Sequence, residues 1–128
     1  MKILKGKVIS GIGDFSKKMK EIPGLLEAYK RKLGVELYPG TLNIQLDEEY
    51  SVPDNSMRLE KEDYGGTVSV YIVPAIIFGK KVFILRTEKY EIGEGTHAKT
   101  TLEIASNVRL RDEFNLCDGD EVEISLHY

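Results

Sequence analysis

Hydrophobic and polar residues alternate along several short stretches of the chain. In YPGTLNIQLD, residues 38–47, the apolar residues Leu42, Ile44 and Leu46 occupy every second position, and polar residues lie between them. Successive side chains of a strand point to opposite faces, so this pattern predicts a strand with one apolar and one polar face. Further strands are predicted at residues 2–10, 67–74, 81–87, 101–105 and 118–126.

One segment has helical rather than alternating spacing. In IPGLLEAYKRKLG, residues 22–34, apolar residues recur three or four positions apart, Pro23 lies near the start, and Gly34 suits the C-terminal cap. A short second helix is predicted at residues 107–114. Many short strands with one main helix and one short helix favour a mainly β protein. A small β-barrel fits this order of elements better than a parallel sheet of βαβ units.

The segments between these elements carry turn-forming residues. Residues 11–21, GIGDFSKKMKE, are predicted to form a polar loop, and residues 48–66 an extended loop or short edge pieces. In IIFGKKV, residues 76–82, Gly79 predicts a tight hairpin with a type II′ turn. The glycine-rich stretch YEIGEGTHAKT, residues 90–100, is expected to be mobile or ordered by a ligand.

Composition and charge limit the function classes. The 128 residues fit one domain, residues 1–128, with 41% hydrophobic and 30% charged residues. No apolar run of about 18 residues exists and the N-terminus lacks the apolar core of a signal peptide, so a cytoplasmic protein without a membrane partner is expected. Cys117 is the only cysteine, and His97 and His127 are too few for a conventional zinc site. The net charge of −3 argues against a protein that coats nucleic acid but not against a local phosphate pocket.

Two polar stretches could hold a nucleotide and a metal ion. In SGIGDFSKK, residues 10–18, glycines could let backbone N–H groups approach an anion, although an ordinary turn with solvated lysines fits the same residues. In GTLN, Thr41 and Asn43 lie on one face of the predicted strand and present two neutral oxygens. Mg²⁺ is commonly held by a few protein oxygens plus substrate phosphates, so a nucleotide could supply the missing charge. Otherwise both side chains simply face solvent.

A third stretch, residues 95–111, combines an acid, a threonine after two glycines, and two arginines. The apolar neighbours of Glu103 on its predicted strand should point the opposite way, so Glu103 faces a groove or water. Arg109 and Arg111 could contact phosphate or frame a base. From the residues alone, Glu103 is equally well a plain surface acid.

Five stretches follow one another in a recognisable order: G-K-V-I-S-G-I-G, G-V-E-L-Y-P-G-T-L-N-I-Q-L-D, T-H, L-E-I-A-S and R-L-R-D-E-F-N-L-C-D-G-D-E-V-E-I. Taken together, over residues 6–124, they resemble the CTP-dependent riboflavin kinases of archaea. G-T-L-N-x-x-L-D combined with L-R-x-x-F-N-L-x-D-G-D carries the resemblance, and neither half alone would be specific enough.

This resemblance implies a small closed six-stranded cradle-loop β-barrel, similar to other flavin-binding barrels. It implies an enzyme that transfers the γ-phosphoryl group of CTP to the 5′-hydroxyl of riboflavin, giving FMN and CDP, with Mg²⁺ as cofactor. The expected partners are these small molecules, with no nucleic acid, and the expected state is a monomer.

The resemblance also implies roles for residues at matching positions. Thr41 and Asn43 would be the Mg²⁺ ligands, and Thr96 and Glu103 would contact the flavin. Glu103 is also the candidate to orient or deprotonate the 5′-hydroxyl. The implied nucleotide-binding residues are Ile12, Gly13, Asp14, Phe15, Ser16, Lys17, Val108, Arg109, Leu110 and Arg111.

Two other classes fit part of the sequence. Swapped-hairpin barrels that bind DNA also end in an L-x-x-G-D-x-V-x-I strand, which LCDGDEVEI matches. The acidic net charge and the absence of a basic arm count against that class. A barrel that binds a flavin or a nucleotide and transfers nothing is the other alternative.

Overall fold

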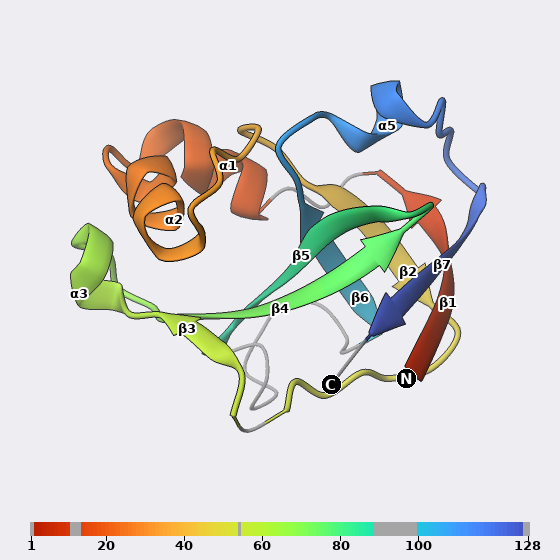
Figure 1. The fold of residues 1–128 in the computed structure, drawn as a ribbon, viewed down its shortest axis with the longest axis horizontal. Coiled ribbons are helices and arrows are strands. Elements are labelled where there is room, and N and C mark those ends of the chain that lie inside the picture. Colours follow the sequence, from red (N-terminus) through yellow and green to blue (C-terminus); the bar gives the residue numbers. More distant parts are fainter. Residues whose placement is uncertain (1, 11–13, 54, 89–99, 127–128) are drawn as a thin grey trace.

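The computed structural model of the protein describes residues 2–10, 14–53, 55–88 and 100–126 (Figure 1). A barrel of strands occupies one side of the molecule, and a group of short helices occupies the other side. Lys2 pairs with Leu126, so the two ends of the described chain lie side by side. Within these ranges, no helix is long and apolar enough to cross a membrane.

Six antiparallel strands close into the barrel. In their order around it they are β4 (Val70–Ile77), β5 (Lys80–Thr87), β6 (Thr101–Ala105), β2 (Leu42–Leu46), β1 (Lys2–Ile9) and β7 (Glu121–Leu126). The pairing of Ile76 in β4 with Ser125 in β7 closes the ring. A further strand, β3 (Met57–Leu59), extends the sheet beyond β4. The predicted closed six-stranded barrel is therefore confirmed.

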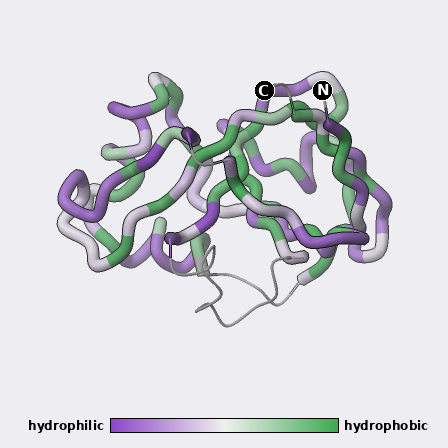
Figure 2. The backbone as a smooth tube through the Cα atoms, turned by 90° about the horizontal axis from the view of Figure 1, so that it is seen from below, coloured by the Kyte–Doolittle hydropathy of each residue, from purple (hydrophilic) through white to green (hydrophobic). Residues whose placement is uncertain are grey.

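Aliphatic side chains from alternate strand positions fill the barrel interior, here called the barrel core. On β2 the predicted apolar face points inward, with Leu42, Ile44 and Leu46 at most 4% exposed. Figure 2 shows hydrophobic and hydrophilic residues alternating along much of the backbone. Gly6 allows β1 and β2 to cross closely, because a Cβ there would clash with the backbone of Gln45 and the side chain of Ile44.

The hairpin between β4 and β5 has the predicted position but a different turn. Ile77 pairs with Lys80, so the loop is the two residues Phe78 and Gly79. Both have positive φ, 49° and 76°. A type I′ turn needs positive φ at both central residues, whereas type II′ needs it only at the first, so the predicted type II′ turn is wrong.

Four helices are seen in the described chain, two more than predicted. The predicted main helix is α2 (Leu25–Leu33), with Gly34 at its C-terminal cap, and the predicted short helix is α5 (Leu110–Glu113). The additional ones are α1 (Asp14–Glu21) and α3 (Lys61–Tyr64). The loop predicted for residues 11–21 is therefore wrong over Asp14–Glu21.

A second apolar cluster, here called the helix-side core, explains why α1 forms. Phe15 and Met19, four residues apart, lie on one face of α1 and are each 4% exposed. They pack with α2 against the outer face of β4, β5 and β6 (Figure 1). The strand residues of this core are Leu59, Val70, Ile72, Phe83, Leu85 and Ala105. Two apolar residues in a polar segment therefore suffice for a helix because the sheet covers them.

Candidate active site

Glu103 lies on the outer face of β6, at the margin of the helix-side core. Its neighbours Leu102 and Ile104 point into the barrel core, so the Glu103 side chain points outward. Across the sheet Glu103 pairs with Asn43 of β2 on one side and with Leu85 of β5 on the other. The residue is only 8% exposed, so Glu103 is not a plain surface acid.

Oxygen atoms of three side chains meet at this position. The Thr41 hydroxyl donates a hydrogen bond to Glu103 Oε1 over 3.0 Å, and Asn43 Oδ1 lies 3.4 Å from the same hydroxyl oxygen. Asn43 is 8% exposed, whereas Gln45, two residues further along β2, is exposed. The polar face of β2 is therefore buried at Asn43 and exposed to solvent at Gln45.

The first turn of α1 also reaches Glu103. The backbone N–H of Phe15 donates to Glu103 Oε1 over 3.2 Å, while the Phe15 side chain is buried in the helix-side core. The first N–H groups of a helix have no partner within the helix and favour a negative charge nearby. Glu103 thus links the start of α1 to β6, which holds α1 beside Thr41.

The predicted nucleotide-binding segment, residues 12–17, does not form a single loop. Ile12 and Gly13 lie outside the described residues, and Asp14–Lys17 is the first turn of α1. Of its side chains, Phe15 is buried and Lys17 is exposed. The Lys18 ammonium lies 5.8 Å from the centre of the Phe15 ring. The Phe15 N–H of this turn faces the carboxylate of Glu103.

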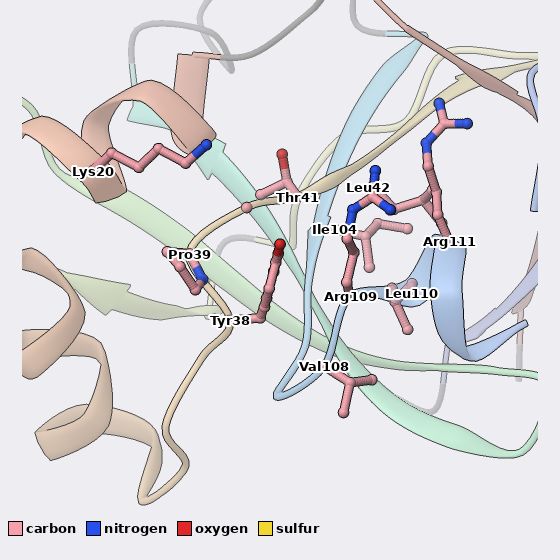
Figure 3. Close-up of a pocket in the computed structure, with 11 residues that line it drawn as sticks. Lys20, Tyr38, Pro39, Thr41, Leu42, Ile104, Val108, Arg109, Leu110 and Arg111 are labelled. Carbon is pink, nitrogen blue, oxygen red and sulfur yellow. The ribbon is translucent and has the colours of Figure 1, made fainter.

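An open pocket of about 210 Å³ adjoins Thr41 (Figure 3). Its charged lining residues are Lys20, Arg109 and Arg111, and no acidic residue of the described ranges lines it. In the view of Figure 3, the Thr41 hydroxyl lies between the Lys20 ammonium and the two guanidinium groups. The remaining lining residues are Tyr38, Pro39, Gly40, Leu42, Ile104, Val108 and Leu110. The pocket is therefore suited to an anion.

Both arginines of the pocket are paired with carboxylates. Arg109 Nη1 lies 2.7 Å from Asp112 Oδ1, and Arg111 Nη2 lies 2.6 Å from Asp118 Oδ1. Arg111 also donates to the carbonyl oxygen of Ile9 over 3.2 Å and to the Ser10 hydroxyl over 3.0 Å. The Arg111 guanidinium, together with the Ser10 hydroxyl, holds the pKa of the Asp118 carboxyl below its usual value. Arg111 therefore ties α5 to the end of β1, where the chain enters residues 11–13.

Tyr29 of α2 is fully buried in the helix-side core. Its hydroxyl has no hydrogen-bond partner among the described residues. Burial, with smaller contributions from Tyr64 and Glu103, raises the pKa of the Tyr29 phenol. The hydroxyl therefore stays neutral at physiological pH.

The donor set at Glu103 fits a hard divalent cation such as Mg²⁺. It offers a hydroxyl, an amide and a carboxylate oxygen, and oxygen is the ligand that Mg²⁺ prefers. The described ranges contain no group of three or more histidine, cysteine or acidic side chains that could hold a metal ion. A cation here would need further oxygens, and a nucleotide in the adjoining pocket could provide them.

The structure brings together most of the predicted site residues that it describes. Thr41, Asn43 and Glu103 meet at one point, and Val108–Arg111 lines the pocket beside them. Thr96, predicted to contact the flavin, lies outside the described residues. Sequence reasoning did not select Lys20, Tyr38 and Pro39, which also line the pocket. The i, i+4 spacing of Phe15 and Met19 indicates a helix with these two residues buried, and such a helix leaves the next residue, Lys20, outside the core.

Comparison with known proteins identifies the family of the chain. Residues 8–126 match the family model CTP-dep_RFKase, whose description reads "Domain of unknown function DUF120". The chain belongs to the CTP-dependent riboflavin kinase family. The resemblance drawn from the sequence motifs is thereby confirmed.

Curated relatives are similar over nearly the whole chain. The riboflavin kinase of Staphylothermus marinus is 31% identical over 97% of this chain and 91% of its own length. That of Sulfurisphaera tokodaii is 33% identical over 97% of this chain and 94% of its own length. The riboflavin kinase of Thermofilum pendens is 34% identical over 94% of this chain, but the match spans only 57% of that longer protein.

Proposed function

We propose that this protein transfers the γ-phosphoryl group of CTP to the 5′-hydroxyl of riboflavin, giving FMN and CDP, and that the reaction requires Mg²⁺. The observation that carries the proposal is the meeting of the Thr41, Asn43 and Glu103 oxygens beside a pocket with three basic side chains. Membership of the riboflavin kinase family supports the choice of reaction.

The nucleotide would bind with its phosphates in the pocket beside Thr41. Phosphoryl transfer asks little covalent chemistry of a protein; it needs in-line positioning and neutralisation of charge on the phosphoryl oxygens. The segment Val108–Arg111 lines this pocket at the start of α5. Its backbone groups and its two guanidinium groups would contact the nucleotide. We assign the first turn of α1 and the residues before it to the same nucleotide.

Thr41 and Asn43 would hold the Mg²⁺ ion, with phosphate oxygens as further ligands. When bound, Mg²⁺ neutralises charge on the phosphoryl group that is transferred. The hydrogen bond from Thr41 to Glu103 orients the Thr41 oxygen and the carboxylate together. Neutral ligands are sufficient here because the nucleotide brings the negative charge.

Glu103 would serve the hydroxyl of riboflavin, with Thr96 as a second flavin contact. In the reaction, the riboflavin 5′-oxygen forms a bond to the γ-phosphorus, and the bond from this phosphorus to the β,γ-bridging oxygen breaks, releasing CDP. The proton of the 5′-hydroxyl passes to the Glu103 carboxylate or to water oriented by it. A base must come within about 3 Å of the hydroxyl oxygen, which requires a carboxylate held in place. The bonds from Thr41 and the Phe15 N–H hold it.

Incubation with riboflavin, Mg²⁺ and either CTP or ATP tests the proposal. We expect FMN with CTP, much less with ATP, and none when the metal is removed with a chelator. No FMN with either nucleotide would contradict the kinase assignment. Riboflavin binding in the same sample would then favour a barrel that binds a flavin without transfer.

The role of Glu103 is tested by Glu103→Gln, which keeps shape but removes the negative charge. We expect kcat to fall by roughly a hundredfold or more, the usual contribution of a general base. The matched control is Glu121→Gln, an exposed glutamate on β7, which lies opposite β6 around the barrel. Near-full turnover of Glu103→Gln would leave Glu103 with a binding role only.

A further inference from the structure

The three basic residues that line the pocket differ in their ion pairs. Arg109 is paired with Asp112 and Arg111 with Asp118, so each arginine is largely neutralised by its carboxylate. Lys20 is the third basic lining residue, and no ion pair joins it to a carboxylate whose side chain the structure describes. Among the described lining residues, Lys20 is therefore the basic side chain that forms no ion pair with a described carboxylate.

The orientation of α1 places Lys20 at the pocket. Phe15 and Met19 point into the helix-side core, and Lys20 follows Met19 by one position, about 100° further around the helix. In Figure 3 the Lys20 side chain extends from α1 toward the Thr41 hydroxyl. The other lysines of this helix differ, since Lys18 lies over the Phe15 ring and Lys17 does not line the pocket.

We infer that Lys20 binds the phosphate groups of the nucleotide, opposite Arg109 and Arg111 and beside Thr41. The inference rests on the proposed function and adds to it a phosphate ligand from α1. A lysine is suited to this role, because its flexible stem carries a compact charge that can follow a phosphate group. Arg109 and Arg111 would need to leave their carboxylates to contribute equally, whereas Lys20 forms no ion pair with a carboxylate side chain that the structure describes.

Calorimetric titration of CDP and of cytidine into the wild type and two variants tests this role. In Lys20→Gln we expect CDP affinity to fall by roughly tenfold, as for the loss of a charge-assisted contact, with cytidine affinity unchanged. Lys30→Gln, an exposed lysine on α2, makes the same change in net charge and should leave CDP affinity at the wild-type value. Lys20→Arg should recover most of the loss, and added salt should narrow the gap between wild type and Lys20→Gln.

Two results separate this inference from the proposed function. Equal CDP affinities in Lys20→Gln and Lys30→Gln, in a wild type that makes FMN, would overturn the role of Lys20 and leave the kinase intact. A wild type that makes no FMN but binds inorganic tripolyphosphate, with that binding weakened only in Lys20→Gln, would support the role of Lys20 and overturn the kinase.

Discussion

The barrel core and the helix-side core are both well buried, but they differ in what lies at their margins. The barrel core is aliphatic on its strands and is enclosed by six strands. The helix-side core contains Phe15, Tyr29 and Phe83. The sheet covers it on one side, and the short helices α1 and α2 cover it on the other. At its edge lie the buried polar residues Asn43 and Glu103. Strands β2 and β6 supply these two polar residues on their outer face and barrel-core residues on their inner face, because successive side chains alternate.

This difference shows how one small barrel can be stable and still carry a site. The inward residues of β2 and β6 fill the barrel core, so they contribute to stability. The outward residues Asn43 and Glu103 are buried beside α1, and the partly exposed Thr41, which is hydrogen-bonded to Glu103, lines the pocket next to them. We expect changes in the barrel core to act through unfolding alone, and changes in the helix-side core to act on stability and, where they loosen α1, also on the site. Three substitutions test this difference.

The largest expected loss of stability is from Ile44→Ala in the barrel core. Ile44 is 0% exposed, so the truncation leaves a cavity that the closed barrel cannot fill, and the free energy of unfolding should fall by about 4 kcal/mol. Urea denaturation measures this, and Ile44→Val, as a control, should lose only about 1 kcal/mol. The folded fraction should retain its affinity for CDP. If Ile44→Ala lost much of its CDP affinity but little stability, the barrel core would also determine the geometry of the site.

A smaller loss is expected from Met19→Ala in the helix-side core. Met19 is buried, but its helix has solvent on the other side and can settle toward the sheet, so about 2 kcal/mol should be lost. Hydrogen exchange should increase in α1 more than in the barrel strands, and CDP affinity should fall because α1 is held less firmly. Met19→Leu should behave like the wild type. Uniform faster exchange over the whole protein would indicate a single cooperative unit instead.

The smallest change, and one of opposite sign, is expected for Tyr29→Phe. The Tyr29 hydroxyl is buried without a partner in the described structure, so its removal should stabilise the protein by about 1 kcal/mol. Tyr64→Phe is the matched control, because the Tyr64 hydroxyl donates to the carbonyl oxygen of Val68 and its loss should destabilise. Thermal unfolding of both variants measures the difference. If Tyr29→Phe destabilised as much as Tyr64→Phe, the Tyr29 hydroxyl would have a partner that the described residues do not include.

Much of the fold was predictable because local patterns and tertiary packing agree. Alternation in 38–47 predicted β2 and its inward face, and the helical spacing of 22–34 predicted α2. The failure at residues 14–21 has a clear reason. Most of this segment is polar, and its helix depends on Phe15 and Met19 being covered by a sheet that is distant in sequence. The turn at Phe78 and Gly79 failed because a single glycine does not reveal that Phe78 also has positive φ.

The sequence by itself determined the alternation that builds the barrel, and its motifs placed the chain in its family. It could also propose Thr41 and Asn43 as a pair on one face of a strand, and Glu103 apart from them, since each has a suitable oxygen. Only the tertiary structure decided that these oxygens lie within hydrogen-bonding distance, because Thr41 and Glu103 are 62 residues apart and meet through the antiparallel pairing of β2 with β6. It also decided that Lys20 faces the pocket, because the side of a helix that remains free is set by what buries the other side.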